Sequence, residues 1–136
     1  MKYLTALFIV ILILIVIAAN LGLAPILFGF LRRIPYGDKL GHFVLMGILS
    51  LLVNLSMRAT RVQIGSFDVL KGSLIVAVVV TIEEFSQIFI RARGFSLVDL
   101  AFDYAGIVTF GTLATYLVNR HAETPEGRSI SIPDQE

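Results

Sequence analysis

A run of polar side chains interrupts an apolar stretch of the chain between residues 81 and 111. The run consists of Glu83, Glu84, Gln87, Arg93, Ser96, Asp99 and Asp103. Ionisable groups are costly in hydrocarbon, and where a membrane protein keeps them they mark functional sites. We therefore take this run as the first part of a candidate functional site.

A second polar group precedes that run, within residues 34–43. Asp38 and His42 are four residues apart, so a helix would place them on one face near its start, with Lys39 beside them. Asp38 has an alternative structural role as an N-cap or first-turn acid, whereas a histidine inside a membrane span is rare. Together the two groups supply an imidazole, several carboxylates and cations. Such a set can transfer protons, bind a divalent metal or bind a charged headgroup.

The composition indicates that membrane-spanning helices position these residues. The 136 residues are 57% hydrophobic and only 15% charged, whereas soluble domains are about 45–50% apolar and about 25% charged. A span needs about 20 apolar residues, and the chain offers such segments at about residues 3–23, 40–57, 72–90 and 97–118. We therefore predict an all-α polytopic membrane protein with four transmembrane helices and a short interfacial segment after the first. The net charge of +1 gives no indication of nucleic-acid binding.

The segments outside the spans are predicted from their polarity. Residues 25–33 are too short to span and end in arginines, which is typical of a segment along the membrane interface. Residues 58–71 are predicted to form a solvated polar loop, and residues 119–136 a polar, disordered tail. Residues 1–118 would then form one transmembrane domain. A cleaved signal peptide is the alternative for the first segment, but the other apolar segments need the membrane too, which favours an uncleaved helix.

The third span is only marginally apolar. Its strongly apolar residues favour insertion by roughly 0.3 to 0.6 kcal/mol each, while two acids near its centre, Glu83 and Glu84, cost about 2.5 to 3.5 kcal/mol each. The acids must therefore lie against other helices or a wet cavity. Adjacent residues on a helix point in different directions, and we favour Glu84 as the one that faces the site. We expect no local structural role for either Glu84 or His42.

The start of the fourth span has two interpretations. Ser96 and Asp99 have the spacing of a capping box, which is a sufficient structural role for both. Asp103 lies one turn deeper on the same face and has no such role. Gly106 continues that face, where the missing side chain lets a neighbouring helix approach closely.

Four spans bring the two polar groups to the same membrane face. We therefore expect His42, Glu84, Arg93 and Asp99 to lie in one shared pocket. If Lys39 and Arg93 belong to the site, the remaining basic residues are more numerous at the opposite face. That distribution predicts N- and C-termini in the cytoplasm and the pocket at the outer face.

Three short motifs and one glycine form a recognisable combination. They are Asp38-Lys39-x-x-His42-Phe43, Glu84-x-x-Gln87, Arg93-x-x-Ser96-x-x-Asp99 and Gly106. The combination, over roughly residues 36–111, resembles the VanZ-like family of small bacterial membrane proteins. The resemblance implies a multi-helix integral membrane protein of the cell envelope, with a link to resistance to the glycopeptide teicoplanin, and it implies no particular reaction. The chain departs from the family at Asp103, where members more often carry Asn, and at Gly111, where the next glycine falls one residue late.

Two interpretations of function follow. In the first, the chain is an intramembrane enzyme acting on an envelope lipid or lipid-linked precursor. His42 or Glu84 would be the general base, and Asp99 or Asp103 would orient the histidine or bind a divalent metal. In the second interpretation the chain binds a headgroup or a partner helix without chemistry. A third possibility is a purely structural polar lock between helices.

The remaining polar residues are assigned to binding. They are Asp38, Lys39, Gln87, Arg93 and Ser96, of which Arg93 and Lys39 would hold an anionic headgroup. The chain has no cysteine, and no serine lies at motif spacing from a histidine, so covalent catalysis is not indicated.

Overall fold

The computed structural model describes residues 1–91 and 94–122. Its elements in chain order are α1 Lys2–Asn20, α2 Ala24–Leu27, η1 Leu31–Arg33, α3 Gly37–Ser56, β1 Arg61–Ile64, β2 Phe67–Leu70, α4 Lys71–Ser86, η2 Gln87–Phe89 and α5 Leu97–Ala122. The helices α1, α3, α4 extended by η2, and α5 are each long and apolar enough to cross a membrane. This confirms the prediction of a mostly helical chain with four candidate spans and a short segment after the first.

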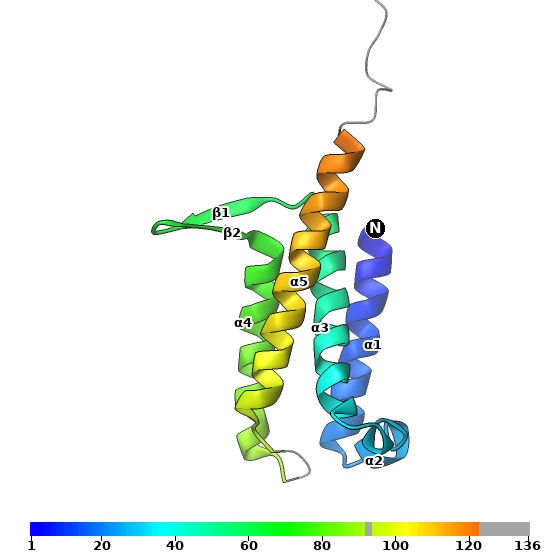
Figure 1. Ribbon diagram of the computed structural model, residues 1–136. Helices are drawn as coiled ribbons and strands as arrows, with labels where there is room; N and C mark the ends of the chain where they lie inside the picture. Colours follow the sequence, from blue (N-terminus) through cyan, green and yellow to red (C-terminus); the bar gives the residue numbers. More distant parts are fainter. Residues whose placement is uncertain (92–93, 123–136) are drawn as a thin grey trace, which may run out of the picture.

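The four long helices run side by side and alternate in direction (Figure 1). The N-terminus, the two strands and the last turns of α5 lie at one end of the bundle, which we call the hairpin end. The short helix α2, the start of α3, the end of α4 and the start of α5 lie at the other end, which we call the α2 end. The two polar groups of the sequence therefore meet at the α2 end.

The closest helix contact joins α3 and α5, and it depends on two glycines. A side chain at Gly106 would collide with the backbone of α3 at Phe43 and Gly47. Gly47 in turn lies against the ring of Phe110. Small residues allow this kind of close approach between helices in a membrane, where burial of apolar surface gives little drive for association. The expectation for Gly106 is confirmed.

The apolar core is small, and most large apolar side chains face outward. Val76, Val80, Leu100 and Ile107 form the buried cluster between α4 and α5. In α1, by contrast, only Thr5, Leu12 and Ala19 are buried. An outward apolar surface of this extent matches hydrocarbon rather than water as the surrounding medium.

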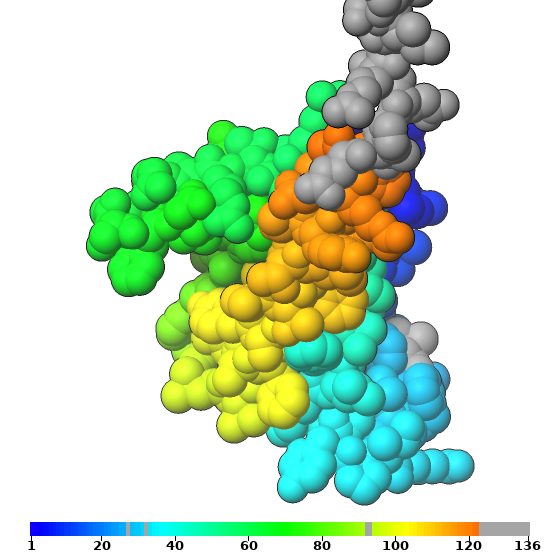
Figure 2. All heavy atoms as spheres, turned by 45° about the horizontal axis from the view of Figure 1, so that its top comes forward, coloured from blue at the N-terminus to red at the C-terminus, as the bar shows by residue number. Residues whose placement is uncertain are grey.

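Between α3 and α4 the structure corrects the prediction of an irregular polar loop. Residues 61–70 form an antiparallel hairpin in which Val62 pairs with Val69 and Ile64 with Phe67. Gly65 has φ of +61°, as the first central residue of a two-residue turn commonly requires. The hairpin projects sideways from the bundle beyond α4 (Figures 1 and 2).

At the C-terminal side the fourth long helix is longer than predicted. It continues to Ala122, past the expected end at residue 118. The rest of the predicted tail, residues 123–136, lies outside the described residues.

Candidate functional site

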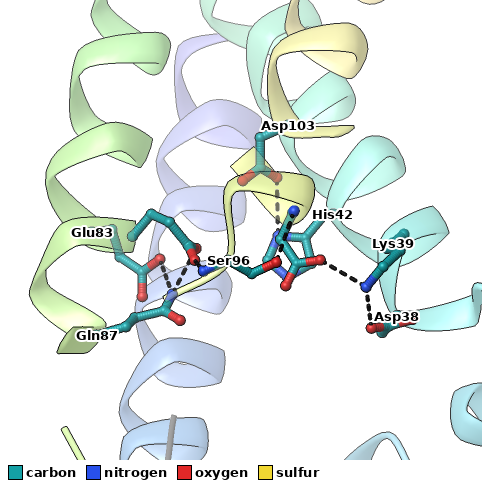
Figure 3. A network of polar contacts seen from close by, with 9 residues as sticks. Asp38, Lys39, His42, Glu83, Gln87, Ser96 and Asp103 are labelled. Carbon is teal, nitrogen blue, oxygen red and sulfur yellow. Dashed lines mark hydrogen bonds and ion pairs between the residues drawn. The ribbon is translucent and has the colours of Figure 1, made fainter. Parts of the chain in front are cut away.

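Three helix ends gather the predicted site residues at the α2 end (Figure 3). The first turns of α3, the end of α4 with η2, and the start of α5 all contribute. We call the set the polar cluster; its members are Asp38, Lys39, His42, Glu83, Glu84, Gln87, Ser96, Asp99 and Asp103. Arg93, the remaining predicted member, lies outside the described residues.

The start of α5 is capped by two separate elements. Ser96 Oγ accepts a hydrogen bond from the Asp99 N–H at 3.2 Å, as the predicted N-cap requires. The reciprocal half of a capping box is absent, because the Ser96 N–H donates to Glu84 Oε1 at 2.7 Å. Glu84 therefore supplies from α4 the carboxylate that Asp99 was predicted to supply. The expectation that Glu84 has no local structural role is wrong.

One carboxamide joins the two acids of α4. Gln87 Nε2 donates to Glu83 Oε2 at 2.9 Å and to Glu84 Oε2 at 3.0 Å. Glu84 is only 1% exposed, whereas Glu83 is partly exposed. The adjacent acids thus diverge as helix geometry demands, and Glu84 is the one directed into the bundle.

The Asp99 side chain does not cap α5. It pairs instead with Lys39 of α3. Lys39 Nζ lies 3.0 Å from Asp99 Oδ1 and 2.9 Å from Asp38 Oδ2. Asp38 lies in the first turn of α3, but Tyr36 occupies the N-cap position and no side chain caps this helix. Of the two structural roles considered for Asp38, the first-turn acid is confirmed and the N-cap is wrong. The two carboxylates hold the ammonium between α3 and α5, and their combined charge exceeds its own.

His42 and Asp103 form the deepest ionisable pair. His42 Nδ1 lies 3.0 Å from Asp103 Oδ1, linking the second turn of α3 to that of α5. The Asp103 side chain is 0% exposed and that of His42 is 27% exposed. When Asp103 is ionised and His42 is neutral, Nδ1 carries the hydrogen and Nε2 is the acceptor. In that state the buried acid orients an imidazole whose outer nitrogen is the basic one.

The electrostatic balance of the polar cluster is acidic. Its carboxylates outnumber its basic groups, and His42 lies close enough to Asp99 and Glu84 to interact with their charges. Asp103 Oδ2 is buried and has no hydrogen-bond partner among the described residues. An orphaned oxygen of this kind is a position where a ligand hydroxyl, a water or a further side chain can bind.

Metal binding and access to the site were both open questions for the sequence. In residues 1–91 and 94–122, no group of three or more His, Asp or Glu side chains is arranged to hold a metal ion. An open depression of about 460 Å³ adjoins the polar cluster at Asp38. Its other lining residues are Arg33, Ile34, Pro35 and Tyr36. Asp38 is the only member of the polar cluster among the residues that line this depression.

A second buried polar group was missed by the sequence reasoning. Ser50 and Asn54 of α3 and Ser73 of α4 form what we call the hydroxyl–amide layer, nearer the hairpin end. Asn54 Nδ2 donates to Ser73 Oγ at 2.8 Å and to the Ser50 carbonyl at 2.9 Å, and Ser50 Oγ donates to the Ile107 carbonyl of α5 at 3.0 Å. The available signal was the four-residue spacing of two polar residues inside a span.

Comparisons with protein-family models, with curated proteins and with solved structures find no match to this chain.

Proposed function

We propose that this chain is a VanZ-like integral membrane protein. Its polar cluster would bind the polar part of a cell-envelope lipid or lipid-linked precursor, and His42 would accept a proton from that ligand. The observation that carries the proposal is the His42–Asp103 pair, with a fully buried acid at 3.0 Å from Nδ1 and a partly exposed imidazole. A buried carboxylate that orients a histidine is the usual arrangement of a general base.

The arrangement of the other members supports a ligand at His42. Lys39 is held by two carboxylates, and Gln87 by two more, so both are already engaged within the protein. His42 makes its hydrogen bond through Nδ1, and the buried polar atom of the cluster that has no partner among the described residues is Asp103 Oδ2. A ligand group with a dissociable proton, such as a hydroxyl, would satisfy Nε2.

The charge of the cluster indicates which chemical groups of a ligand it would bind. Lys39 is already matched by Asp38 and Asp99, so it offers little to a phosphate. Because carboxylates predominate, hydroxyl or amine groups of a headgroup suit the described residues better than an anion does. Arg33 and Arg91, both exposed at the α2 end, would bind the lipid phosphate.

The proposed orientation places the α2 end at the outer face of the cell membrane. The basic residues described at the hairpin end are Lys2, Arg58, Arg61, Lys71 and Arg120. With Lys39 counted as part of the site, the other basic residues described at the α2 end are Arg32, Arg33 and Arg91. The hairpin end therefore has the excess, which favours the cytoplasmic side. The polar cluster would then face envelope precursors, in keeping with the glycopeptide-resistance link that the family resemblance implies.

The test compares two site variants with a matched control. His42→Gln and Asp103→Asn should abolish the protein's effect on glycopeptide susceptibility, and lipid retained on the purified protein in native mass spectrometry should be lost. His121→Gln should change neither readout, because His121 is exposed at the opposite end of the bundle, bonded only within its own helix. Membrane abundance is measured for all three variants.

The alternative function is a helix-assembly protein without a ligand. It is favoured by the number of contacts in the cluster that join different helices, such as Lys39 with Asp99 and Glu84 with Ser96. If both site variants keep full phenotype and bound lipid at normal abundance, the ligand proposal is rejected. The helix-assembly interpretation then stands.

A further inference from the structure

The hairpin of β1 and β2 has one apolar and one polar face. Directly opposite residues of an antiparallel pair share a face, and alternate residues along a strand do too. The pairing of Val62 with Val69 and of Ile64 with Phe67 therefore makes one face wholly apolar. The other face carries Gln63 and the ion pair of Arg61 with Asp68, whose atoms are 2.7 Å apart, and, at the base of the hairpin, the buried Leu70.

The apolar face has no protein layer over it at its tip. Phe67 is 73% exposed and Ile64 is 47% exposed. An isolated two-stranded hairpin is at best marginally stable in water, and three strands or a packed apolar face are needed for independent stability. The hairpin therefore needs a covering layer over this apolar face to be stable.

The exit of the hairpin from the bundle is held in place by its base. Arg58 and Ala59 both have positive φ, at 52° and 51°, a strained backbone that persists only where its surroundings determine it. The Ala59 N–H donates to the Asn54 carbonyl at 2.7 Å, and the Lys71 N–H to the Thr60 carbonyl at 2.9 Å. The sideways direction of the hairpin is thus part of the fold.

The hairpin lies where the membrane surface would be. It begins shortly after the end of span α3, and β2 leads at Lys71 directly into span α4. It runs crosswise to the helices and projects beyond α4 (Figures 1 and 2). The outward side chains of α4, among them Ile75, Val79 and Ile82, are exposed and apolar as a lipid-facing surface must be. The hairpin therefore overhangs the lipid that surrounds α4.

The charge near the hairpin also matches a lipid surface. Arg58 and Lys71 are exposed at its base, and Asp68, the one acid of the hairpin, is already paired with Arg61. Basic residues close to a span are attracted by the anionic headgroups of a membrane leaflet.

We propose that the hairpin is an interfacial anchor. Its face of Val62, Ile64, Phe67 and Val69 enters the headgroup region of the leaflet at the hairpin end, continuous with the lipid-facing side of α4. The polar face stays in water. The proposal is independent of the ligand at the polar cluster, which lies at the opposite end of the bundle.

The chain contains no tryptophan, so a single introduced one reports on the hairpin alone. Phe67→Trp and Ile64→Trp place the reporter on the apolar face, and Gln63→Trp is the matched control on the polar face. The full chain is reconstituted in vesicles of phosphatidylcholine with phosphatidylglycerol, with bromine at defined depths of the acyl chains. The apolar-face reporters should be quenched most by shallow bromines, about 5–10 Å below the surface. Gln63→Trp should be quenched by aqueous acrylamide instead.

Two outcomes overturn the proposal. If the tryptophans at 64 and 67 are quenched by acrylamide as strongly as the one at 63, the face is in water. If they are shielded from both quenchers, and the shielding is lost as the lipid-to-protein ratio rises, a second copy of the chain covers the face. Using two reporter positions guards against local misfolding of either variant, and circular dichroism checks the helix content of each.

Discussion

The hydroxyl–amide layer and the polar cluster join the same three helices but differ in charge. The layer is made of hydroxyls, an amide and two carbonyls, whereas the polar cluster contains several carboxylates, a lysine and a histidine. Each leaves one buried oxygen without a partner among the described residues, Asn54 Oδ1 in the first and Asp103 Oδ2 in the second.

This difference in charge distinguishes a structural role of buried polar residues from a functional one. Neutral hydrogen bonds between spans specify which helices pack together at little desolvation cost. Buried charges add little stability over apolar residues of the same size, because removing them from water costs as much as their pairing returns. The charged group is also the partly exposed one, through His42, while Ser50 and Asn54 are fully buried. This contrast is consistent with a structural role for the layer and with the ligand-binding role proposed for the cluster.

The largest expected effect comes from giving the neutral layer a charge. Asn54→Asp would set a carboxylate oxygen against the Ser50 carbonyl, at the position from which Nδ2 now donates over 2.9 Å. Its neighbours Ser50, Ser73 and Gly72 are uncharged. An uncompensated buried charge costs about 3–5 kcal/mol, so this variant should unfold at much lower denaturant in an SDS titration of mixed micelles.

The reciprocal change serves as its control. Asp103→Asn keeps the shape of a fully buried side chain and removes its charge, so the folded protein should survive the same titration nearly unchanged. Equal destabilisation by the two substitutions would contradict the distinction drawn between the two groups.

An intermediate effect is expected from separating α3 and α5 between the two polar groups. Gly106→Ala would bring a methyl group into the backbone of Phe43 and Gly47, so the helices must move apart. Overpacking of this kind costs about 1–3 kcal/mol, measured by the same titration, and should disturb both groups together. Gly41→Ala on α3 is the control, since its methyl group would meet only Leu31 Cδ1 at 3.8 Å. Unchanged stability of Gly106→Ala would show that the contact is looser than described.

The smallest effect should come from weakening the neutral layer without adding charge. Ser73→Ala removes the hydroxyl that accepts from Asn54 at 2.8 Å, a bond between α3 and α4. Hydrogen bonds between spans average about 0.6 kcal/mol and reach about 1.7 kcal/mol. Thr109→Ala is the control, because its exposed hydroxyl bonds to Ala105 of its own helix. A loss of the glycopeptide phenotype in stable Ser73→Ala protein would argue that the layer has more than a structural role.

The sequence predicted the spans and the meeting of the polar residues, because both follow from apolar length and from counting crossings. From the sequence, Asp99 and Asp103 are both possible partners of His42, because they lie on one face of α5. The spacing does not decide between them. The choice depends on Lys39, which pairs with Asp99 and leaves Asp103 to the histidine. Which of the two acids pairs with the histidine depends on distances between helices. The spacing of residues along one helix does not give those distances.

Two other features were not predicted from the sequence, for different reasons. The bond from Ser96 to Glu84 replaces a capping box whose residues are all present, so local pattern alone pointed to Asp99. The hairpin, by contrast, had a visible signal, with apolar residues alternating on both sides of Gly65 and Ser66. The alternation was overlooked because the segment is polar overall and connects two spans.

The bond between Glu84 and Ser96 also bears on how the chain enters the membrane during synthesis. The Glu84 carboxylate lies near the end of α4, and the Ser96 amide that donates to it comes twelve residues later. The translocation machinery therefore meets α4 before its acid has that partner. Once α5 has also been synthesised, α4 and α5 can leave the machinery together as a helical hairpin, with the Glu84 carboxylate and the free Ser96 amide bonded to each other and shielded from the lipid.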